Sequence, residues 1–201
     1  MDGLTFCSKL KSHPLTSHIP VILLTARSSG AQQAEGLSMG ADAYLTKPFD
    51  AEVLIAQIDS LLVNRRHLRE LFSKEGRGED NAAAGAESQE ISTPDRQFMD
   101  NLRTAINKNM GNAKLKMDDI GAELGISRVQ LYRKVKALTG LSPVELLRQF
   151  RLQRAYKLLQ STDKTVAEVC YEVGFSTPGY FSSCFKRQYG KYPTELKREE
   201  K

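Results

Sequence analysis

The chain has 201 residues, of which 40% are hydrophobic and 26% are charged, and these values are ordinary for one or two globular domains. No apolar run approaches the roughly 20 residues that span a bilayer, and we expect no signal peptide. Three scattered cysteines, Cys7, Cys170 and Cys184, are too few for a disulfide scaffold or a zinc site. We therefore expect a cytoplasmic protein in a reducing setting, without a metal ion or another cofactor.

The formal net charge of +5 is unevenly distributed along the chain. Residues 94–201 contain 20 Lys or Arg against 12 Asp or Glu, whereas residues 1–63 contain 4 against 6 and residues 64–93 contain 5 against 6. Basic charge gathered in one part indicates either a polyanionic partner for that part or a solubilising surface. Charge alone does not separate these two interpretations.

Residues 1–72 alternate between helical and strand patterns. The pattern predicts a short helix around Phe6 and Leu10, a strand over Ile19–Thr25 that is buried on both faces, a polar helix over 29–39, a strand over 43–46 and an amphipathic helix over 51–62. Two parallel strands leave a hydrophobic edge and faces that so few helices cannot cover. The segment is therefore predicted to be the back half of a larger α/β domain.

Two motifs at the ends of the predicted strands are specific. Leu24-Thr25-Ala26, and then Tyr44-Leu45-Thr46-Lys47-Pro48, resemble the C-terminal half of a response-regulator receiver domain. The resemblance implies that Thr25 senses a phosphoryl group, that Lys47 binds one of its oxygens, that Tyr44 reorients as a switch, and that the Lys47–Pro48 peptide is cis. Thr25 and Lys47 are alternatively ordinary residues at strand ends.

The phosphoacceptor of that family is absent from this sequence. The resemblance places the acidic pair and the acceptor Asp in the first three strands, upstream of Met1. Asp2 matches the loop after the acceptor, and Asp42 precedes the last strand. We therefore expect no phosphorylation of this chain at an aspartate, and incorporation of label from acetyl phosphate would contradict this.

Residues 73–94 have the composition of a linker. Large apolar side chains are missing between Glu75 and Ile91, and glycines recur. Such a stretch cannot bury enough surface to offset its ordering entropy, so a flexible linker is predicted.

The rest of the chain is predicted to be helical, and it repeats. Residues 119–127 recur 49 residues later as residues 168–176, each a short helix closed by a glycine suited to a left-handed cap. In the first copy, Ser127 caps a second helix with a buried stripe of Leu131, Val135 and Leu138. In the second copy, Thr165 and Glu168 form a capping box, and Thr177 caps a helix that begins at Pro178 and buries Phe181, Cys184 and Phe185.

Residues 95–198 closely resemble the DNA-binding domain of the AraC/XylS family. The motifs that carry the resemblance are Gly174-Phe175-Ser176, Tyr180-Phe181, Phe185-Lys186, Gly190 and Pro193, with Ser142-Pro143, Arg151-Leu152 and Ala155 before them. It implies two helix-turn-helix units, joined by a helix over about 143–160, whose recognition helices enter successive major grooves roughly 34 Å apart. The expected fold is mainly α: an all-helical double helix-turn-helix module over 95–201 and an incomplete α/β, flavodoxin-like receiver segment over 1–72.

The outer faces of the two recognition helices supply the candidate DNA contacts. Arg can pair with guanine, Gln with adenine, and an apolar side chain can touch the thymine methyl group. The expected base contacts are Arg128, Val129, Gln130, Arg133, Gly179, Tyr180, Ser182 and Ser183. The expected phosphate contacts, which position the protein without reading sequence, are Lys134, Lys136, Lys186 and Arg187. Each charge is alternatively a solvated surface group, and for Arg151 a structural role in the bridging helix is favoured.

Three functions are compatible with these features. The leading one is a sequence-specific transcription regulator, expected to activate, that is the output module of a two-component phosphorelay and resembles the C-terminal end of a hybrid sensor-regulator. Its expected partners are double-stranded DNA, RNA polymerase, the histidine-kinase domain of the parent or of a partner protein, and a second copy in a homodimer. The alternative is a phosphorelay interaction module without specific DNA binding. An enzyme is not expected, because His13, His18 and His67 show no ligand or triad spacing.

Overall fold

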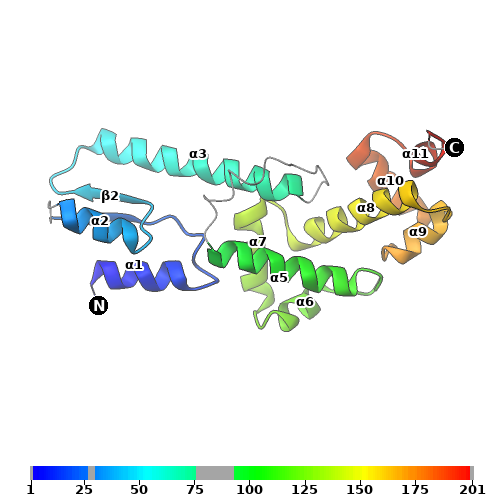
Figure 1. Cartoon of the computed structure of the whole chain (residues 1–201), viewed down its shortest axis with the longest axis horizontal. Helices are drawn as coiled ribbons and strands as arrows, with labels where there is room; N and C mark the ends of the chain where they lie inside the picture. Colours follow the sequence, from blue (N-terminus) through cyan, green and yellow to red (C-terminus); the bar gives the residue numbers. More distant parts are fainter. Residues whose placement is uncertain (1, 27–29, 76–92, 200–201) are drawn as a thin grey trace. The chain divides into compact units, whose positions relative to one another are not determined.

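The computed structural model describes residues 2–26, 30–75 and 93–199, which form two compact units. The first unit comprises the described residues within Met1–Phe72, Asn81–Met99 and Arg133–Gly140, and the second comprises those within Ser73–Asp80, Asp100–Tyr132 and Leu141–Lys201. The elements, all but β1 labelled in Figure 1, are α1 (Gly3–Ser12), β1 (Ile22–Thr25), α2 (Gly30–Ser38), β2 (Ala43–Thr46), α3 (Ala51–Glu75), α5 (Thr93–Asn109), α6 (Met117–Glu123), α7 (Arg128–Thr139), α8 (Pro143–Ser161), α9 (Val166–Glu172), α10 (Pro178–Tyr189) and α11 (Pro193–Glu199).

The sheet of the first unit is a parallel pair in which Thr25 of β1 lies opposite Thr46 of β2. The strand β1 begins at Ile22, later than predicted, because the backbone of Ile19 is engaged elsewhere. Its N–H donates to the carbonyl of Thr16, at 2.9 Å, and its carbonyl accepts from Nζ of Lys11, at 2.8 Å. The prediction of burial on both faces is wrong: Leu24 is 42% exposed, because the described helices leave part of one face of this two-stranded sheet uncovered.

Helix α2 connects the two strands of this sheet, and α3 follows β2. A Cβ on Gly36 of α2 would lie 2.8 Å from the ring of Tyr44, so the absence of a side chain lets the helix approach β2. Helix α3 continues to Glu75, beyond the predicted end at Leu62, because residues 63–75 are rich in helix formers and contain neither Gly nor Pro. The first three residues of the predicted linker are therefore helical, and residues 76–92 lie outside the described residues.

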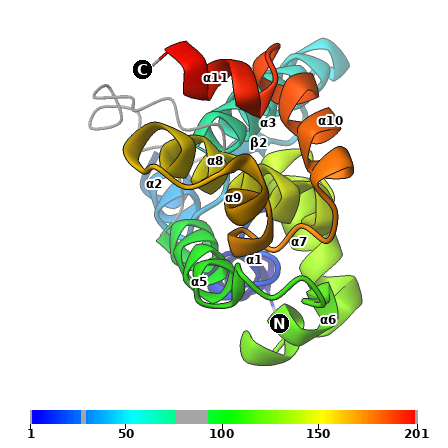
Figure 2. The same cartoon turned by 90° about the vertical axis from the view of Figure 1, so that its right-hand side faces the viewer.

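The last four helices of the second unit enclose a hydrophobic core. Helix α8 contacts α9 and α11, and α10 contacts α9 and α11, as the end-on view in Figure 2 shows. The buried side chains of this core are Leu152, Ala155, Leu158, Leu159, Val169, Cys170, Val173, Phe175, Phe181, Cys184, Phe185 and Leu196. The burial of Phe181, Cys184 and Phe185 confirms the predicted inner face of the second recognition helix.

The predicted repeat is present as two helix-turn-helix pairs, α6–α7 and α9–α10. Gly125 and Gly174, which end the first helix of each pair, have φ of 68° and 84°, in the left-handed region that glycine adopts without strain. Helix α8 bridges the pairs as predicted, and a capping box of Ser142 and Glu145 opens it. The expected mainly α fold with a partial α/β segment is confirmed. None of the helices in the described ranges is both long and apolar enough to cross a membrane.

Candidate nucleic-acid interface

The first recognition helix, α7, begins with a reciprocal cap. Oγ of Ser127 accepts from the backbone N–H of Gln130, at 3.3 Å, which confirms the predicted cap. In return, Oε1 of Gln130 accepts from the backbone N–H of Ser127, at 2.8 Å. A bidentate contact with adenine needs both the oxygen and the nitrogen of the Gln130 amide. Its oxygen is already engaged in the cap, which sequence reasoning did not foresee.

The two faces of α7 separate core from surface. Leu131, Val135 and Leu138 are buried, which confirms the predicted inner stripe. The predicted base-contact residues Arg128, Val129 and Arg133 are exposed, as is Lys136. Tyr132, which sequence reasoning missed, is 50% exposed. Its position one turn after Arg128 was the signal that could have placed it on the outer face.

Lys134 does not belong to this outer face. It is 1% exposed, and its ammonium group pairs with the carboxylate of Asp95 and donates to Oγ of Ser17, at 2.8 Å. The prediction that Lys134 contacts a phosphate is therefore wrong. The physical reason is its helical position, three residues after Leu131 and next to Val135, which turns it toward the buried side, where a carboxylate compensates its charge.

The second recognition helix, α10, has a weaker start than predicted. Thr177 occupies the N-cap position, but its side chain forms no cap hydrogen bond, and Pro178 follows at the first helical position. Tyr180 is 56% exposed, and Gly179 has open space where a Cβ would stand. Of the remaining predicted base contacts, Ser183 is exposed and Ser182 is half-buried.

On α10, the hydroxyl of Ser183 is engaged in a hydrogen bond, whereas the side chains of Lys186 and Arg187 are exposed. Oγ of Ser183 donates to the carbonyl of Gly179, at 3.0 Å, which occupies its one proton. Lys186 and Arg187 are exposed, as a phosphate contact requires. The ammonium group of Lys186 lies 4.1 Å from the ring centroid of Tyr192, a cation–π distance that limits its orientations.

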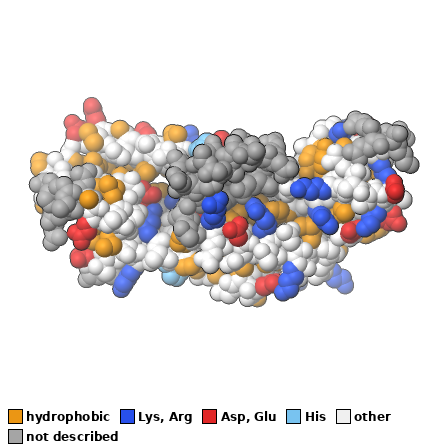
Figure 3. Space-filling model, viewed as in Figure 1, with side chains coloured by type: hydrophobic (Ala, Val, Ile, Leu, Met, Phe, Trp, Pro, Cys, Tyr) orange, Lys and Arg blue, Asp and Glu red, His pale blue; other side chains and the backbone are white. Residues whose placement is uncertain are grey.

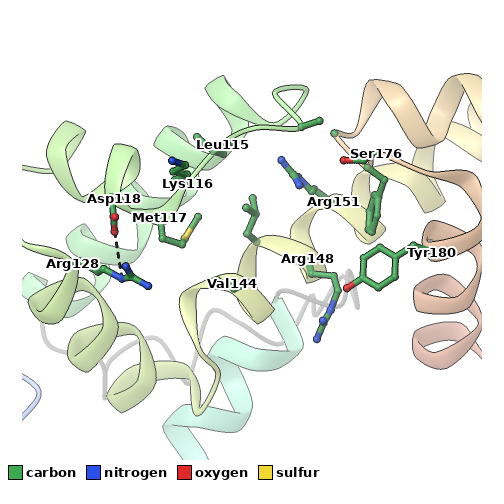
Figure 4. A pocket seen from close by; sticks show the side chains of 14 residues that line it. Leu115, Lys116, Met117, Asp118, Arg128, Val144, Arg148, Arg151, Ser176 and Tyr180 are labelled. Atoms are coloured by element: carbon green, nitrogen blue, oxygen red, sulfur yellow. Dashed lines mark ion pairs between the residues drawn. The ribbon is translucent and has the colours of Figure 1, made fainter.

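A cavity of about 410 Å³ lies between the two helix-turn-helix pairs of the second unit, where α6, α7, α8 and the start of α10 meet (Figure 4). Its lining includes Arg128, which pairs with Asp118 at 3.5 Å, and also Arg148 and Tyr180. Arg151 lines it too, but Nη2 of Arg151 donates to the carbonyl of Asn112, at 2.7 Å. Burial lowers the pKa of the Arg151 guanidinium below its ordinary value, and the contact favours the structural role for this residue.

Basic side chains are spread over the C-terminal helices rather than gathered in one patch on the face that Figure 3 shows. Acidic side chains lie between them on this face. The excess of basic charge counted in residues 94–201 is thus distributed over several elements, which suits contacts at separated points along a polyanion.

Of the expected receiver residues, Thr25 is the last residue of β1 and Lys47 follows β2, whereas Tyr44 is the second residue of β2. The backbone N–H of Lys47 donates to the carbonyl of Thr25, at 2.6 Å, so the two residues are neighbours, and the Lys47–Pro48 peptide is cis as the resemblance implied. Thr25 and Tyr44 line a cavity of about 200 Å³ together with Asp2. The Lys47 side chain is exposed and does not line this cavity. Among the described side chains, no group of three His, Cys, Asp or Glu is arranged to hold a metal ion.

Comparison with known families gives two matches. Residues 120–199 match the model of a helix-turn-helix domain, and residues 1–59 match the model of the response regulator receiver domain.

Several curated proteins and solved structures are similar to the chain. It is 38% identical over 196 residues to Histidine kinase P4 of Formosa agariphila, an alignment that covers 97% of this chain and 14% of that protein. It is 44% identical over 78 residues to Response regulator PleD of Caulobacter vibrioides, which covers 39% of this chain and 17% of that protein. The C-terminal domain of AraT, a response regulator from Geobacillus stearothermophilus, is 31% identical, with a TM-score of 0.48 over 55% of this chain and 88% of that one.

Proposed function

We propose that the chain is the DNA-binding output part of a two-component regulator, because residues 120–199 match the model of a helix-turn-helix domain and residues 1–59 match the model of the response regulator receiver domain. The observation that carries the proposal is the repeated helix-turn-helix, in which α7 and α10 each bury one face and expose the other. The exposed face of such a helix is the one that enters a major groove.

The two recognition helices are proposed to read bases in different ways. On α7, Arg128 and Arg133 present guanidinium groups suited to guanine, and Val129, 56% exposed, is suited to the thymine methyl group. On α10, Gly179 and Tyr180 are the most open of the proposed contacts. Ser182 and Ser183 remain proposed base contacts, and Gln130 contributes through its amide nitrogen. Lys136, Lys186 and Arg187 are proposed phosphate contacts.

A selection experiment tests this function. The whole chain is incubated with a duplex library randomised over about 20 bp, the length of two helical turns. Bound duplexes are recovered and sequenced, and the affinity for one selected duplex is measured at several salt concentrations. Enrichment of two half-sites about one helical turn apart, with affinity that falls as salt rises, is the expected result. Salt-insensitive or absent binding would favour the interaction module without specific DNA binding.

The whole protein is proposed to be a hybrid sensor-regulator. The chain spans about one seventh of Histidine kinase P4, to which nearly all of it aligns, and we propose a kinase in the same polypeptide as the partner of the receiver segment. A coding sequence that continues upstream of Met1 and supplies an acceptor Asp would support this. Transcriptional activation through RNA polymerase and homodimer formation are further proposals, tested by in vitro transcription and by sedimentation equilibrium.

A further inference from the structure

The cavity of about 410 Å³ lies where the beginnings of both recognition helices meet the bridging helix. Arg128 is the first residue of α7, Tyr180 is in the first turn of α10, and Val144 and Arg148 belong to α8 between them. Between two successive major grooves, a duplex presents its minor groove and the two sugar-phosphate strands that border it. A duplex read by both α7 and α10 therefore brings backbone, rather than base edges, to this cavity.

The side chains that α8 turns toward the cavity suit a sugar-phosphate backbone. Val144, Arg148 and Arg151 stand four and then three residues apart, so they form one stripe along the helix. Val144 is 63% exposed, so its side chain offers apolar surface at the cavity. At the other side of the cavity, the ring of Tyr180 adds exposed apolar surface (Figure 4).

The three arginines that line the cavity, Arg128, Arg148 and Arg151, differ in their partners. Arg151 is committed to the carbonyl of Asn112, and Arg128 faces the carboxylate of Asp118. In the described part of the chain, Arg148 has neither an ion pair nor a hydrogen bond, although it is half-buried. A half-buried guanidinium with unused donors is suited to an anion that arrives from outside.

We propose that this cavity receives the DNA backbone that crosses between the two major grooves. The Arg148 guanidinium donates hydrogen bonds to a phosphate oxygen, and Val144 and Tyr180 pack against the adjoining deoxyriboses. The inference rests on the proposed DNA-binding function and adds to it a third contact region on the bridging helix. Because the contact is with the backbone, it strengthens binding to every sequence and fixes the spacing between the half-sites.

The first test compares three variants of the whole chain on one selected duplex. Arg148→Ala is expected to bind roughly tenfold more weakly at 50 mM salt and to lower the slope of log affinity against log salt by about 0.9, the value for one phosphate contact. Arg148→Lys keeps the charge and should keep most of the slope. Arg154→Ala is the matched control, because Arg154 is an exposed arginine of α8 that does not line the cavity, and it should leave the slope unchanged.

The second test places the contact on the DNA. Duplexes carrying a neutral methylphosphonate at single positions between the half-sites are titrated with the wild type and with Arg148→Ala. At one of these positions, the methylphosphonate is expected to lower the affinity of the wild type for the duplex. It should have little further effect on the affinity of Arg148→Ala, because this variant has already lost the same contact. Equal penalties for both proteins at every position, or an unchanged salt slope in Arg148→Ala, would overturn the cavity proposal while wild-type binding still supports the proposed function. Failure of the wild type to bind any selected duplex would instead overturn the proposed function itself.

Discussion

The ammonium group of Lys134 on α7 lies against the carboxylate of Asp95 on α5, and the two side chains are 1% and 5% exposed. Oγ of Ser17 donates to the same carboxylate, at 2.7 Å, and the ring of Phe98 lies 5.5 Å from the ammonium group. Burial lowers the pKa of Lys134, and the hydrogen bond with Asp95 opposes that shift. The pair is therefore a buried ion pair that connects α5 to the recognition helix α7.

Lys134→Met is expected to lower the free energy of unfolding by about 3–5 kcal/mol, because it leaves the Asp95 carboxylate buried without its cation. Urea denaturation measures the loss. Lys136→Met, an exposed lysine on the same helix, is the control and should stay within about 0.5 kcal/mol of the wild type. The double variant Lys134→Met/Asp95→Leu should recover most of the loss, since both charges are then gone. Equal stability of the two single variants would contradict the role of the pair.

His18 makes the stability of the first unit depend on pH. Burial, and then the charge of Lys134, lower the pKa of its imidazole to about 4, although Asp95 acts in the opposite direction. The folded chain therefore holds His18 neutral at a pH where the unfolded chain protonates it, so stability falls as pH drops from about 6.5 to about 4. For a half-exposed ring we expect a loss of about 1–2 kcal/mol over this range.

The measurement is urea denaturation of the wild type and of His18→Gln at pH 7 and at pH 5. The variant should lose less stability between the two values, because the titrating group has been removed while the other acids and bases are unchanged. His13→Gln is the control, because His13 is exposed. An identical pH dependence in wild type and His18→Gln would argue against the lowered pKa of His18.

Gln130 allows the cap of α7 to be separated from base recognition. Gln130→Glu keeps an acceptor at the third helical position and should keep the cap with Ser127, whereas Gln130→Ala should cost about 0.5–1 kcal/mol of stability. Only the amide nitrogen can donate to a base, so Gln130→Glu should alter the selected DNA sequence while thermal stability is retained. An unaltered sequence preference in Gln130→Glu would assign Gln130 to the cap alone.

Arg133 is expected to read one base pair. Arg133→Ala should cost about 1–3 kcal/mol on the selected duplex and almost nothing on a duplex changed at the cognate base pair, because the contact is lost in either case. Binding to single-substitution duplexes measures both values. Lys186→Ala is the contrast: it should weaken binding to all duplexes alike and reduce the salt slope by about one. A uniform loss for Arg133→Ala would make it a phosphate contact.

The features that sequence reasoning predicted correctly are those that depend on neighbours along the chain. Caps, left-handed glycines and the stripe of Leu131, Val135 and Leu138 all follow from spacings of three and four residues. The burial of Lys134 could not be predicted in this way, because its partner Asp95 stands 39 residues earlier in the sequence. A lysine at the border of a stripe is compatible with either face, and only the tertiary contact decides between them.

The same limit applies to the candidate site. Exposure of Arg128 and Arg133 follows from helical periodicity, but the cap that occupies the oxygen of Gln130 depends on a rotamer. Arg148 carried no sequence signal at all, since a lone arginine on a long helix is ordinarily a solvated charge. Its place in a cavity appears only when the two helix-turn-helix pairs are folded onto the bridging helix.

The two glycines that close α6 and α9 give a matched pair of variants. Both have positive φ, so an alanine at either position costs about 1–2 kcal/mol of backbone strain. At Gly125 nothing lies within 4 Å of the added Cβ, and Gly125→Ala should lose only that amount. At Gly174 the Cβ would meet the carbonyl of Met110 and lie 2.8 Å from Nη2 of Arg151.

Gly174→Ala is therefore expected to lose more than about 3 kcal/mol, because the clash adds to the strain and displaces the hydrogen bond from Arg151 to the carbonyl of Asn112. Urea denaturation of the two variants side by side gives the difference. Because Arg151 and Arg148 line the same cavity, Gly174→Ala should also weaken DNA binding under conditions where it is still folded, and Gly125→Ala should do so less. Equal losses in the free energy of unfolding for the two variants would show that the backbone around Met110 shifts to accommodate the Cβ with little loss of stability.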